Sequence, residues 1–88
     1  TGADCSGFTS YVYAHFGISI PSFSGAQRSC GQEVSYANAQ AGDLICYAGH
    51  VAIYMGGGKI VHAKGTAYGI VGNDNATYKT IITVRRLL

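Results

Sequence analysis

The first part of the chain has the spacing of an amphipathic helix. Within residues 6–16, apolar or aromatic side chains recur every three or four positions, at Phe8, Tyr11, Val12 and then His15 or Phe16. This spacing lines one side of an α-helix, so the pattern predicts a helix that buries that face. Asp4 can cap its first turn, and Gly17 can adopt the positive φ that commonly ends a helix.

Shorter apolar runs in the second half predict β-strands. Residues 44–47 form a continuous apolar run of buried-strand length, residues 50–55 and 59–63 are two β-prone runs, and residues 81–85 form a last one. Residues 67–78 are rich in Gly, Asn, Asp and Thr, which predicts a turn-rich connection. One helix followed by several antiparallel strands is an α+β plan.

The loop of the central hairpin decides where two histidines lie. Three glycines at 56–58 are a strong hairpin signal, and a three-residue loop pairs Met55 with Lys59. In that register, the side chains of His50 and His62 are diagonal neighbours on one face. A two-residue loop would place them on opposite faces. The face opposite the histidines, which suits a core, would carry Val51, Ile53, Met55 and Val61.

Composition and charge narrow the class of protein. The chain has 88 residues, of which 48% are hydrophobic and 11% are charged, as is typical of one globular domain. A net charge of +2 is too small for a nucleic-acid-binding surface, and no apolar run approaches the roughly 20 residues of a membrane span. We therefore expect a single domain, residues 1–88, with no nucleic-acid partner, no membrane span and no cofactor or metal.

The three cysteines Cys5, Cys30 and Cys46 form no Cys-x-x-Cys pair, so neither a zinc ribbon nor a thioredoxin-type redox motif is available. An odd number leaves at least one thiol free. A disulfide between Cys30 and Cys46 is compatible with an oxidising compartment, but the apolar run around Cys46 favours a small buried hydrophobic residue.

Cys5, His50 and His62 can supply the three groups of thiol-based catalysis. A cysteine at the start of a helix lies near unpaired backbone N–H groups, which stabilise a thiolate. Such a nucleophile needs a base, and the base needs a third group that orients its ring. Simpler structural interpretations also exist: Cys5 could pack inward, His50 could bind a loop carbonyl, and His62 could be an exposed polar residue. A zinc site is disfavoured, because the three residues lack closely spaced ligand pairs.

Four motifs in order resemble a known family. Asp-Cys-Ser-Gly-Phe at residues 4–8 resembles the nucleophile signature of the NlpC-type cell-wall cysteine peptidases, papain-like enzymes of bacteria. Ala-Gly-Asp-Leu at 41–44, His-Val-Ala-Ile-Tyr at 50–54 and Gly-Lys-Ile-Val-His-Ala at 58–63 are similar to its later motifs, and Arg85-Arg86 lies in the closing strand. The resemblance implies a papain-like α+β core, in which the nucleophile-bearing N-terminal helix packs on an antiparallel β-sheet.

The resemblance also implies a reaction. The family hydrolyses peptide stems of bacterial peptidoglycan, commonly between D-glutamate and a diamino acid. Carried over, Cys5 is the nucleophile with its backbone N–H in the oxyanion hole, His50 is the general base and acid, and His62 orients His50. Asp4 and Ser6 correspond to residues that help hold the free amino end of the stem peptide. The alternatives are a non-catalytic module that binds cell-wall peptide or a partner, and an acyltransferase or amidase with the same thiol–imidazole pair.

The sequence departs from the family pattern at several places. Family members usually have a segment with a tyrosine before the cysteine, whereas the chain begins at Thr1, without a methionine or a signal peptide. We therefore expect a catalytic domain that lacks its N-terminal segment and could associate with that segment as a separate chain. Ser22 follows Pro21 where an arginine is common, and Arg28 could substitute for it. The substrate implies an extracellular or cell-wall location.

Overall fold

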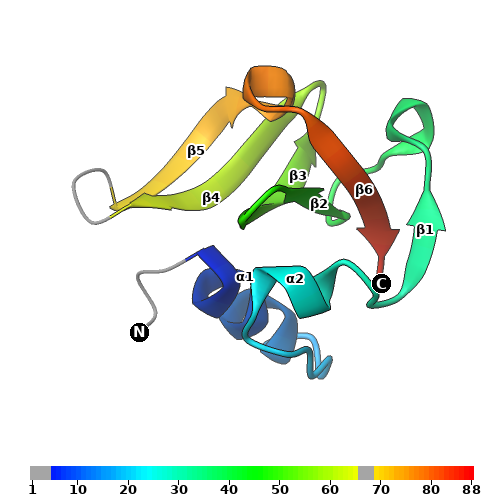
Figure 1. Cartoon of the computed structure of the whole chain (residues 1–88), viewed down its shortest axis with the longest axis vertical. Helices are drawn as coiled ribbons and strands as arrows, with labels where there is room; N and C mark the ends of the chain where they lie inside the picture. The colour runs from blue at the N-terminus through cyan, green and yellow to red at the C-terminus, as the bar shows by residue number, and fades with distance from the viewer. Residues whose placement is uncertain (1–4, 66–68) are drawn as a thin grey trace.

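The computed structural model describes residues 5–65 and 69–88, which form short helices beside one antiparallel sheet (Figure 1). The elements in chain order are α1 (Cys5–Ala14), α2 (Ser24–Gln27), β1 (Gln32–Val34), the 3₁₀ helix η1 (Tyr36–Asn38), β2 (Leu44–Tyr47), β3 (His50–Gly56), β4 (Lys59–Gly65), β5 (Gly69–Asn75), the 3₁₀ helix η2 (Ala76–Tyr78) and β6 (Ile81–Arg86). Within these residues, six strands pair in the order β1-β6-β2-β3-β4-β5. The α+β class is confirmed, as are the four predicted strands.

Helix α1 packs against β3 and β4, but its buried face differs from the predicted one. Phe8 and Val12 pack against the core as expected, whereas Tyr11 and Phe16 are 64% and 63% exposed, so their predicted burial is wrong. The fully enclosed positions are Ser6, Thr9 and Tyr13.

Hydrogen bonds explain why polar residues occupy this buried face. The Thr9 hydroxyl donates to Oε1 of Gln27 at 2.7 Å, and Nε2 of Gln27 donates to the Ser6 carbonyl at 3.1 Å. The Tyr13 hydroxyl donates to the carbonyl of Gly42 at 2.6 Å. Because each polar group has a partner, its burial costs little.

The helix ends as predicted at Gly17, which has a φ of 77°. The Ile18 N–H donates to the Tyr13 carbonyl, and the Gly17 N–H donates to the Ala14 carbonyl, both at 3.0 Å. These two bonds form a Schellman motif, which satisfies carbonyls at the end of the helix. The predicted cap at the other end, Asp4, lies outside the described residues.

Both faces of the sheet are buried. The face toward α1 carries Leu44, Cys46, Val51 and Ile53. The opposite face carries Ile45, Tyr47, Ala52, Tyr54, Ile60 and Val84, and packs against Ala76 of η2 and Tyr36 of η1. Side chains alternate along a strand, so His50 and His62 belong to this second face. Cys46 is fully buried, as predicted, and burial raises the pKa of its thiol to about 11. Cys30 and Cys46 are both free thiols.

The β3–β4 hairpin contains a two-residue turn instead of the predicted three-residue loop. Gly57 and Gly58 have φ values of 62° and 80°, and Gly56 pairs with Lys59 across the turn. Positive φ at both central positions suits glycine and the twist of a hairpin. The predicted pair of Met55 with Lys59 is therefore wrong. Met55 is also 47% exposed, so its predicted place in the core is wrong.

A bulge at Met55 nevertheless preserves the predicted register. The pairing shifts between Tyr54 and Gly56, and Tyr54 pairs with Ile60. The extra residue compensates for the shorter turn, since each single-residue shift exchanges the two faces. His50 and His62 therefore lie on the same face, as predicted.

The prediction of a turn-rich connection is wrong for residues 69–78, which form the edge strand β5 and η2. Strand β5 pairs with β4, with Ile60 opposite Asp74 and His62 opposite Val71. Its many Gly, Asn and Asp residues have low β propensity, so the strand depends on hydrogen bonds to β4. This strand brings an additional acidic side chain beside the histidines.

Candidate active site

Two histidines form the centre of the site. His50 begins β3, and His62 lies within β4. Their rings meet edge-on at a centroid distance of 4.9 Å, with Nε2 of His50 2.6 Å from Nδ1 of His62. The structure thus brings together the predicted base and its predicted orienting group. His62 is fully buried, so the alternative of an exposed polar residue is wrong.

Asp74 of β5 lies behind His62 and extends the pair into a chain of three side chains. Nε2 of His62 is 3.1 Å from Oδ2 of Asp74, and Nζ of Lys64 donates to the same oxygen at 3.1 Å. Oδ1 of Asp74 accepts a hydrogen bond from the backbone N–H of Asn75 at 3.0 Å. The hydrogen bond from His62, followed by that from Lys64, lowers the pKa of Asp74 below its ordinary value. The carboxylate is therefore ionised near neutral pH.

Two tyrosines enclose the histidine pair. The ring of Tyr78 lies 6.3 Å from that of His50 and 5.4 Å from that of His62, and the ring of Tyr47 lies 5.8 Å from that of His50. Tyr47 is fully buried and donates its hydroxyl to the Ala76 carbonyl, whereas Tyr78 is 39% exposed. Tyr78 therefore separates the imidazoles from solvent at the rim of the site.

This environment keeps His50 neutral. Burial, the neighbouring charge of His62 and the charge of Lys79 lower the pKa of His50 to about 4. Lys79 is held nearby, because its ammonium donates to the carbonyl of Ala48 at 3.3 Å. A neutral imidazole can accept a proton at pH 7, as a general base must.

Cys5 is the first residue of α1 and is half-buried. The helix packs on β3 and β4, the two strands that carry the histidines. Burial, then the charges of Asp74 and Cys5, raise the pKa of Tyr78, so the thiol lies within electrostatic reach of the ring that covers the histidines. At the helix N-terminus, the thiol also faces the positive end of the helix dipole.

Of the two predicted substrate-binding residues, Asp4 and Ser6, the structure describes only Ser6. The Ser6 side chain is turned inward, since its hydroxyl donates to the Ser22 carbonyl at 2.7 Å and the residue is only 8% exposed. Asp4 lies outside the described residues. A role for either residue in binding the stem peptide stays a prediction.

Comparison with known proteins assigns the chain to a family. Residues 1–86 match the model of the NlpC/P60 family. The chain belongs to the NlpC/P60 family. It is 46% identical over 69 residues to the probable endopeptidase p60 of Listeria seeligeri, and 44% identical over 70 residues to the peptidoglycan endopeptidase RipB of Mycobacterium tuberculosis. These matches cover 73% and 75% of the chain.

Solved structures of NlpC/P60 proteins have the same fold. The structure of the peptidoglycan hydrolase RipB from Mycobacterium tuberculosis superposes with a TM-score of 0.82 at 37% identity, covering 94% of this chain and 44% of that one. The NlpC/p60 domain of the peptidoglycan hydrolase SagA superposes with a TM-score of 0.82 at 33% identity, covering 96% of this chain and 76% of that one. The predicted papain-like NlpC-type core is therefore confirmed.

The chain spans only a small part of its curated relatives, namely 13% of p60 and 29% of RipB. Among its described residues, no helix combines the length and the hydropathy that a membrane span needs.

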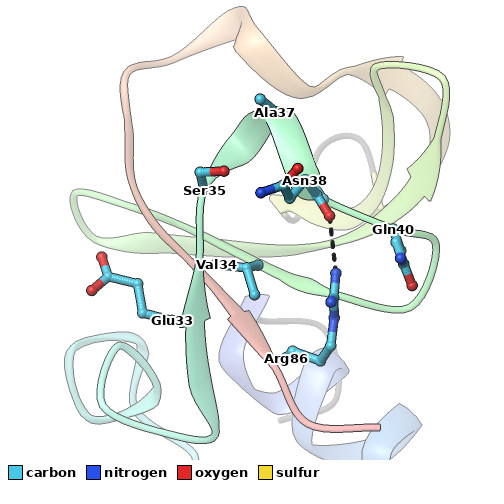
Figure 2. Close-up of a pocket in the computed structure, with 8 residues that line it drawn as sticks. Glu33, Val34, Ser35, Ala37, Asn38, Gln40 and Arg86 are labelled. Atoms are coloured by element: carbon cyan, nitrogen blue, oxygen red, sulfur yellow. Dashed lines mark hydrogen bonds between the residues drawn. The ribbon is translucent and has the colours of Figure 1, made fainter.

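A cavity of about 800 Å³ lies away from the histidines, beside β1, η1 and the end of β6 (Figure 2). Its lining does not include the histidines and consists of Glu33, Val34, Ser35, Ala37, Asn38, Ala39, Gln40 and Arg86. The Arg86 guanidinium already donates to the carboxylate of Asp43 and to the carbonyl of Asn38 (Figure 2). Its charge is thus paired with that of Asp43, and the candidate site is the one centred on the histidines.

Three residues beside the histidine pair were not among the predicted ones: Asp74, Tyr78 and Lys79. Asp74 and Tyr78 lie within residues 67–78, the segment that was predicted to be a connection, and Lys79 follows it directly. The pairing of β5 with β4 is the information that would have found Asp74, because it places that residue opposite Ile60, two positions from His62. No local sequence pattern indicates this pairing.

Proposed function

We propose that this NlpC/P60 chain is a cysteine endopeptidase that hydrolyses the peptide stems of bacterial peptidoglycan. The observation that carries the proposal is the 2.6 Å contact between His50 and His62, which gives a neutral base a fixed ring orientation on the two strands against which the helix starting at Cys5 packs. The names of two relatives, the peptidoglycan endopeptidase RipB and the probable endopeptidase p60, support the same reaction.

In the proposed acylation step, Nδ1 of His50 accepts the thiol proton while the sulfur of Cys5 attacks the carbonyl carbon of the substrate. The new C–S bond displaces the carbonyl π electrons onto oxygen, and backbone N–H groups at the start of α1 stabilise this oxyanion. His50 then gives its proton to the leaving nitrogen. The C–N bond breaks, and a thioester and a free amine result.

Deacylation reverses these roles. Neutral His50 accepts a proton from water as the water oxygen attacks the thioester carbon. The tetrahedral intermediate collapses with loss of the sulfur, which recovers the proton from His50. The products are a carboxylic acid and the free thiol of Cys5, so the complete reaction consumes only the peptide and one water molecule.

The proposed bond is the one between D-glutamate and a diamino acid. The negative charge of Asp4 suits the free amino end of a stem peptide, and Ser6 is proposed to contribute to the same end of the site. This substrate implies an extracellular or cell-wall location. We further propose that the chain acts together with a segment that precedes the nucleophile in its relatives.

Mass spectrometry of defined stem peptides and muropeptides tests this proposal. The peptides are incubated with the parent chain, with Cys5→Ala, and with Cys30→Ala as a matched control. Cys30 is a half-buried thiol whose sulfur makes a weak contact of 3.8 Å with the Ala26 carbonyl. We expect cleavage by the parent and by Cys30→Ala, and a loss of at least about 10³-fold in Cys5→Ala.

Each other outcome rejects a defined part of the proposal. Full hydrolysis by Cys5→Ala would reject the thiol mechanism. Saturable binding of stem peptide without turnover by the parent, measured with the upstream segment of a relative supplied, would favour a binding module. Products cut at a different bond, or carrying a transferred acyl group, would indicate an amidase or an acyltransferase.

A further inference from the structure

Asp74 lies at the end of a chain of hydrogen bonds that runs through His62 to His50. Its Oδ2 accepts from His62 at 3.1 Å, and His62 in turn contacts His50 at 2.6 Å. We infer that Asp74 is a positioning residue, which acts through His62 to determine which ring nitrogen of His50 is free to accept a proton. The catalytic consequence rests on the function proposed above, whereas the proton arrangement can be measured without turnover.

The argument follows from the donors and acceptors along the chain. An ionised carboxylate can only accept hydrogen bonds, so Nε2 of His62 carries the proton that Asp74 accepts. In the neutral form of His62, the lone pair is then on Nδ1, the atom that faces His50. Nε2 of His50 therefore donates to His62, and the lone pair of His50 lies on Nδ1.

Without the carboxylate, nothing in this chain of bonds selects that arrangement. His62 could carry its proton on Nδ1 and donate it to Nε2 of His50. The proton of His50 would then occupy Nδ1, and this nitrogen could not accept the proton of Cys5. Asp74 therefore excludes an inactive tautomer of the histidine pair, as a partner beyond the reacting groups commonly does.

The surroundings of Asp74 are built to hold its carboxylate in place. Lys64 donates to Oδ2, the oxygen that also accepts from His62, and the backbone N–H of Asn75 donates to Oδ1. Both carboxylate oxygens are therefore held by a donor other than His62. The positive charge of Lys64 favours the ionised form of Asp74, the form that accepts from His62. His62 is fully buried, which limits the competition of water for its ring nitrogens.

A bulge in β5 orients Asp74 toward the histidines. Ile60 pairs with Asp74 and His62 pairs with Val71, so β5 has one more residue than β4 between these two pairs. Within this bulge, Asn73 has a φ of 61°, a left-handed conformation that asparagine tolerates better than most residues. The bulge places both Val71 and Asp74 on the face of His62, and bulges are frequent beside active sites.

The test compares the parent with Asp74→Asn. The amide of asparagine can donate to Nε2 of His62, which reverses the proton chain. Asn75→Ala is the matched control, because it removes a hydrogen bond from the same strand, between Nζ of Lys59 and the Asn75 side chain, that does not involve the histidines. The ¹⁵N shifts of the imidazoles report the tautomer of His50, and the exposed His15 serves as an internal reference.

We expect the parent and Asn75→Ala to show His50 with its proton on Nε2. In Asp74→Asn, we expect a mixed or reversed tautomer, a fall in kcat of about 10²-fold with KM nearly unchanged, and a thermal midpoint close to that of the parent. Asp74→Glu, which keeps the carboxylate, should recover part of the loss in kcat.

Two results would overturn the inference. One is a His50 proton on Nδ1 in the parent. The other is an Asp74→Asn variant with the tautomer and kcat of the parent. If the parent proves inactive on stem peptides, the proposed function fails, but the imidazole shifts of parent and variant still decide whether Asp74 sets the tautomer.

Discussion

Two aspartates in this chain, one next to a central strand and one on an edge strand, show how differently one residue type can be used. Asp43 precedes β2 and accepts from Nε and Nη2 of Arg86 at 3.0 and 2.8 Å. Asp74 lies on the edge strand β5 and accepts from His62 and Lys64. The first carboxylate pairs with a cation that never loses its proton, and the second pairs with an imidazole that can.

The two carboxylates also differ in their burial. The side chain of Asp43 is 5% exposed, and its Oδ2 also accepts from the backbone N–H of Gln40. The side chain of Asp74 is 22% exposed. A buried carboxylate with permanent donors stabilises the fold, whereas a carboxylate at the rim beside a titratable ring can influence a reaction at little cost to stability. The difference predicts separable effects of mutating each residue.

The largest effect is expected for Asp43→Ala. This substitution leaves the Arg86 guanidinium without its carboxylate partner and removes the oxygen that accepts a hydrogen bond from the backbone N–H of Gln40. We expect a loss of about 2–4 kcal/mol in the free energy of unfolding, as for other partly buried charge pairs that lose one member. Urea denaturation monitored by circular dichroism measures this loss.

Asp74→Ala provides the contrast in the same experiment. Water can reach the position of its partly exposed carboxylate, so we expect a clearly smaller loss in the free energy of unfolding than for Asp43→Ala. Equal destabilisation by the two substitutions would contradict the division between a structural and a functional carboxylate.

The same two aspartates show which parts of the molecule the sequence could predict. Asp43 belongs to a local motif, Ala-Gly-Asp-Leu, that precedes a clear apolar strand. Asp74 lies in Gly-Asn-Asp-Asn, a composition typical of turns, and becomes part of a strand only through its pairing with β4. Local propensity cannot report a pairing that depends on tertiary contacts. The sequence therefore predicted the histidine pair but not the residue behind it.

Helix α1 shows a second limit of pattern analysis. Its start, its glycine end and its packing on the sheet followed from the sequence, but its buried face includes Thr9 and excludes Tyr11. Hydrophobic spacing treats Thr9 as polar and exposed, whereas Gln27, 18 positions later in the chain, provides its buried partner. Motifs were more informative at this site than periodicity, because Cys5 and His50 were identified by their neighbours in the sequence.

A graded effect is expected from pH, and it separates the two regions by their titration ranges. The pKa of His50 is about 4 in the folded chain against 6.5 ordinarily, so between these values the unfolded chain binds a proton that the folded chain does not. Stability should therefore fall as the pH decreases from 6.5 to 4, with a slope of at most about 1.4 kcal/mol per pH unit.

The contribution of Asp43 falls in a lower range. Burial alone would raise its pKa, but the hydrogen bonds from Arg86 and Gln40 outweigh burial and lower it below 3.8. Its stabilisation is complete above that value and is lost as the pH falls through the lowered pKa. The free energy of unfolding can be measured at each pH from 7 to 3. Its slope between pH 6.5 and pH 4 should be lost in His50→Gln and kept in Asp43→Asn. An unchanged slope in His50→Gln would contradict this assignment.

The smallest effect concerns Tyr78, which shields the histidines on the functional side of the comparison. Burial is the main cause of the low pKa of His50, and the ring of Tyr78 contributes part of that burial. In Tyr78→Ala, water reaches the imidazole, so its pKa should rise toward 6.5 by about one pH unit or less. Tyr78→Phe keeps the ring and should keep the pKa of the parent.

Proton NMR titration of His50 measures this shift directly, and the pH dependence of kcat/KM measures its consequence. A base with a raised pKa is protonated over a wider acidic range, so Tyr78→Ala should lose activity at a higher pH than the parent, with the rate near pH 7.5 little changed. An equal shift in Tyr78→Phe would show that the hydroxyl, rather than the ring, controls the base. The absence of a shift in both variants would mean that the sheet alone, through neighbours such as Tyr47, keeps His50 neutral.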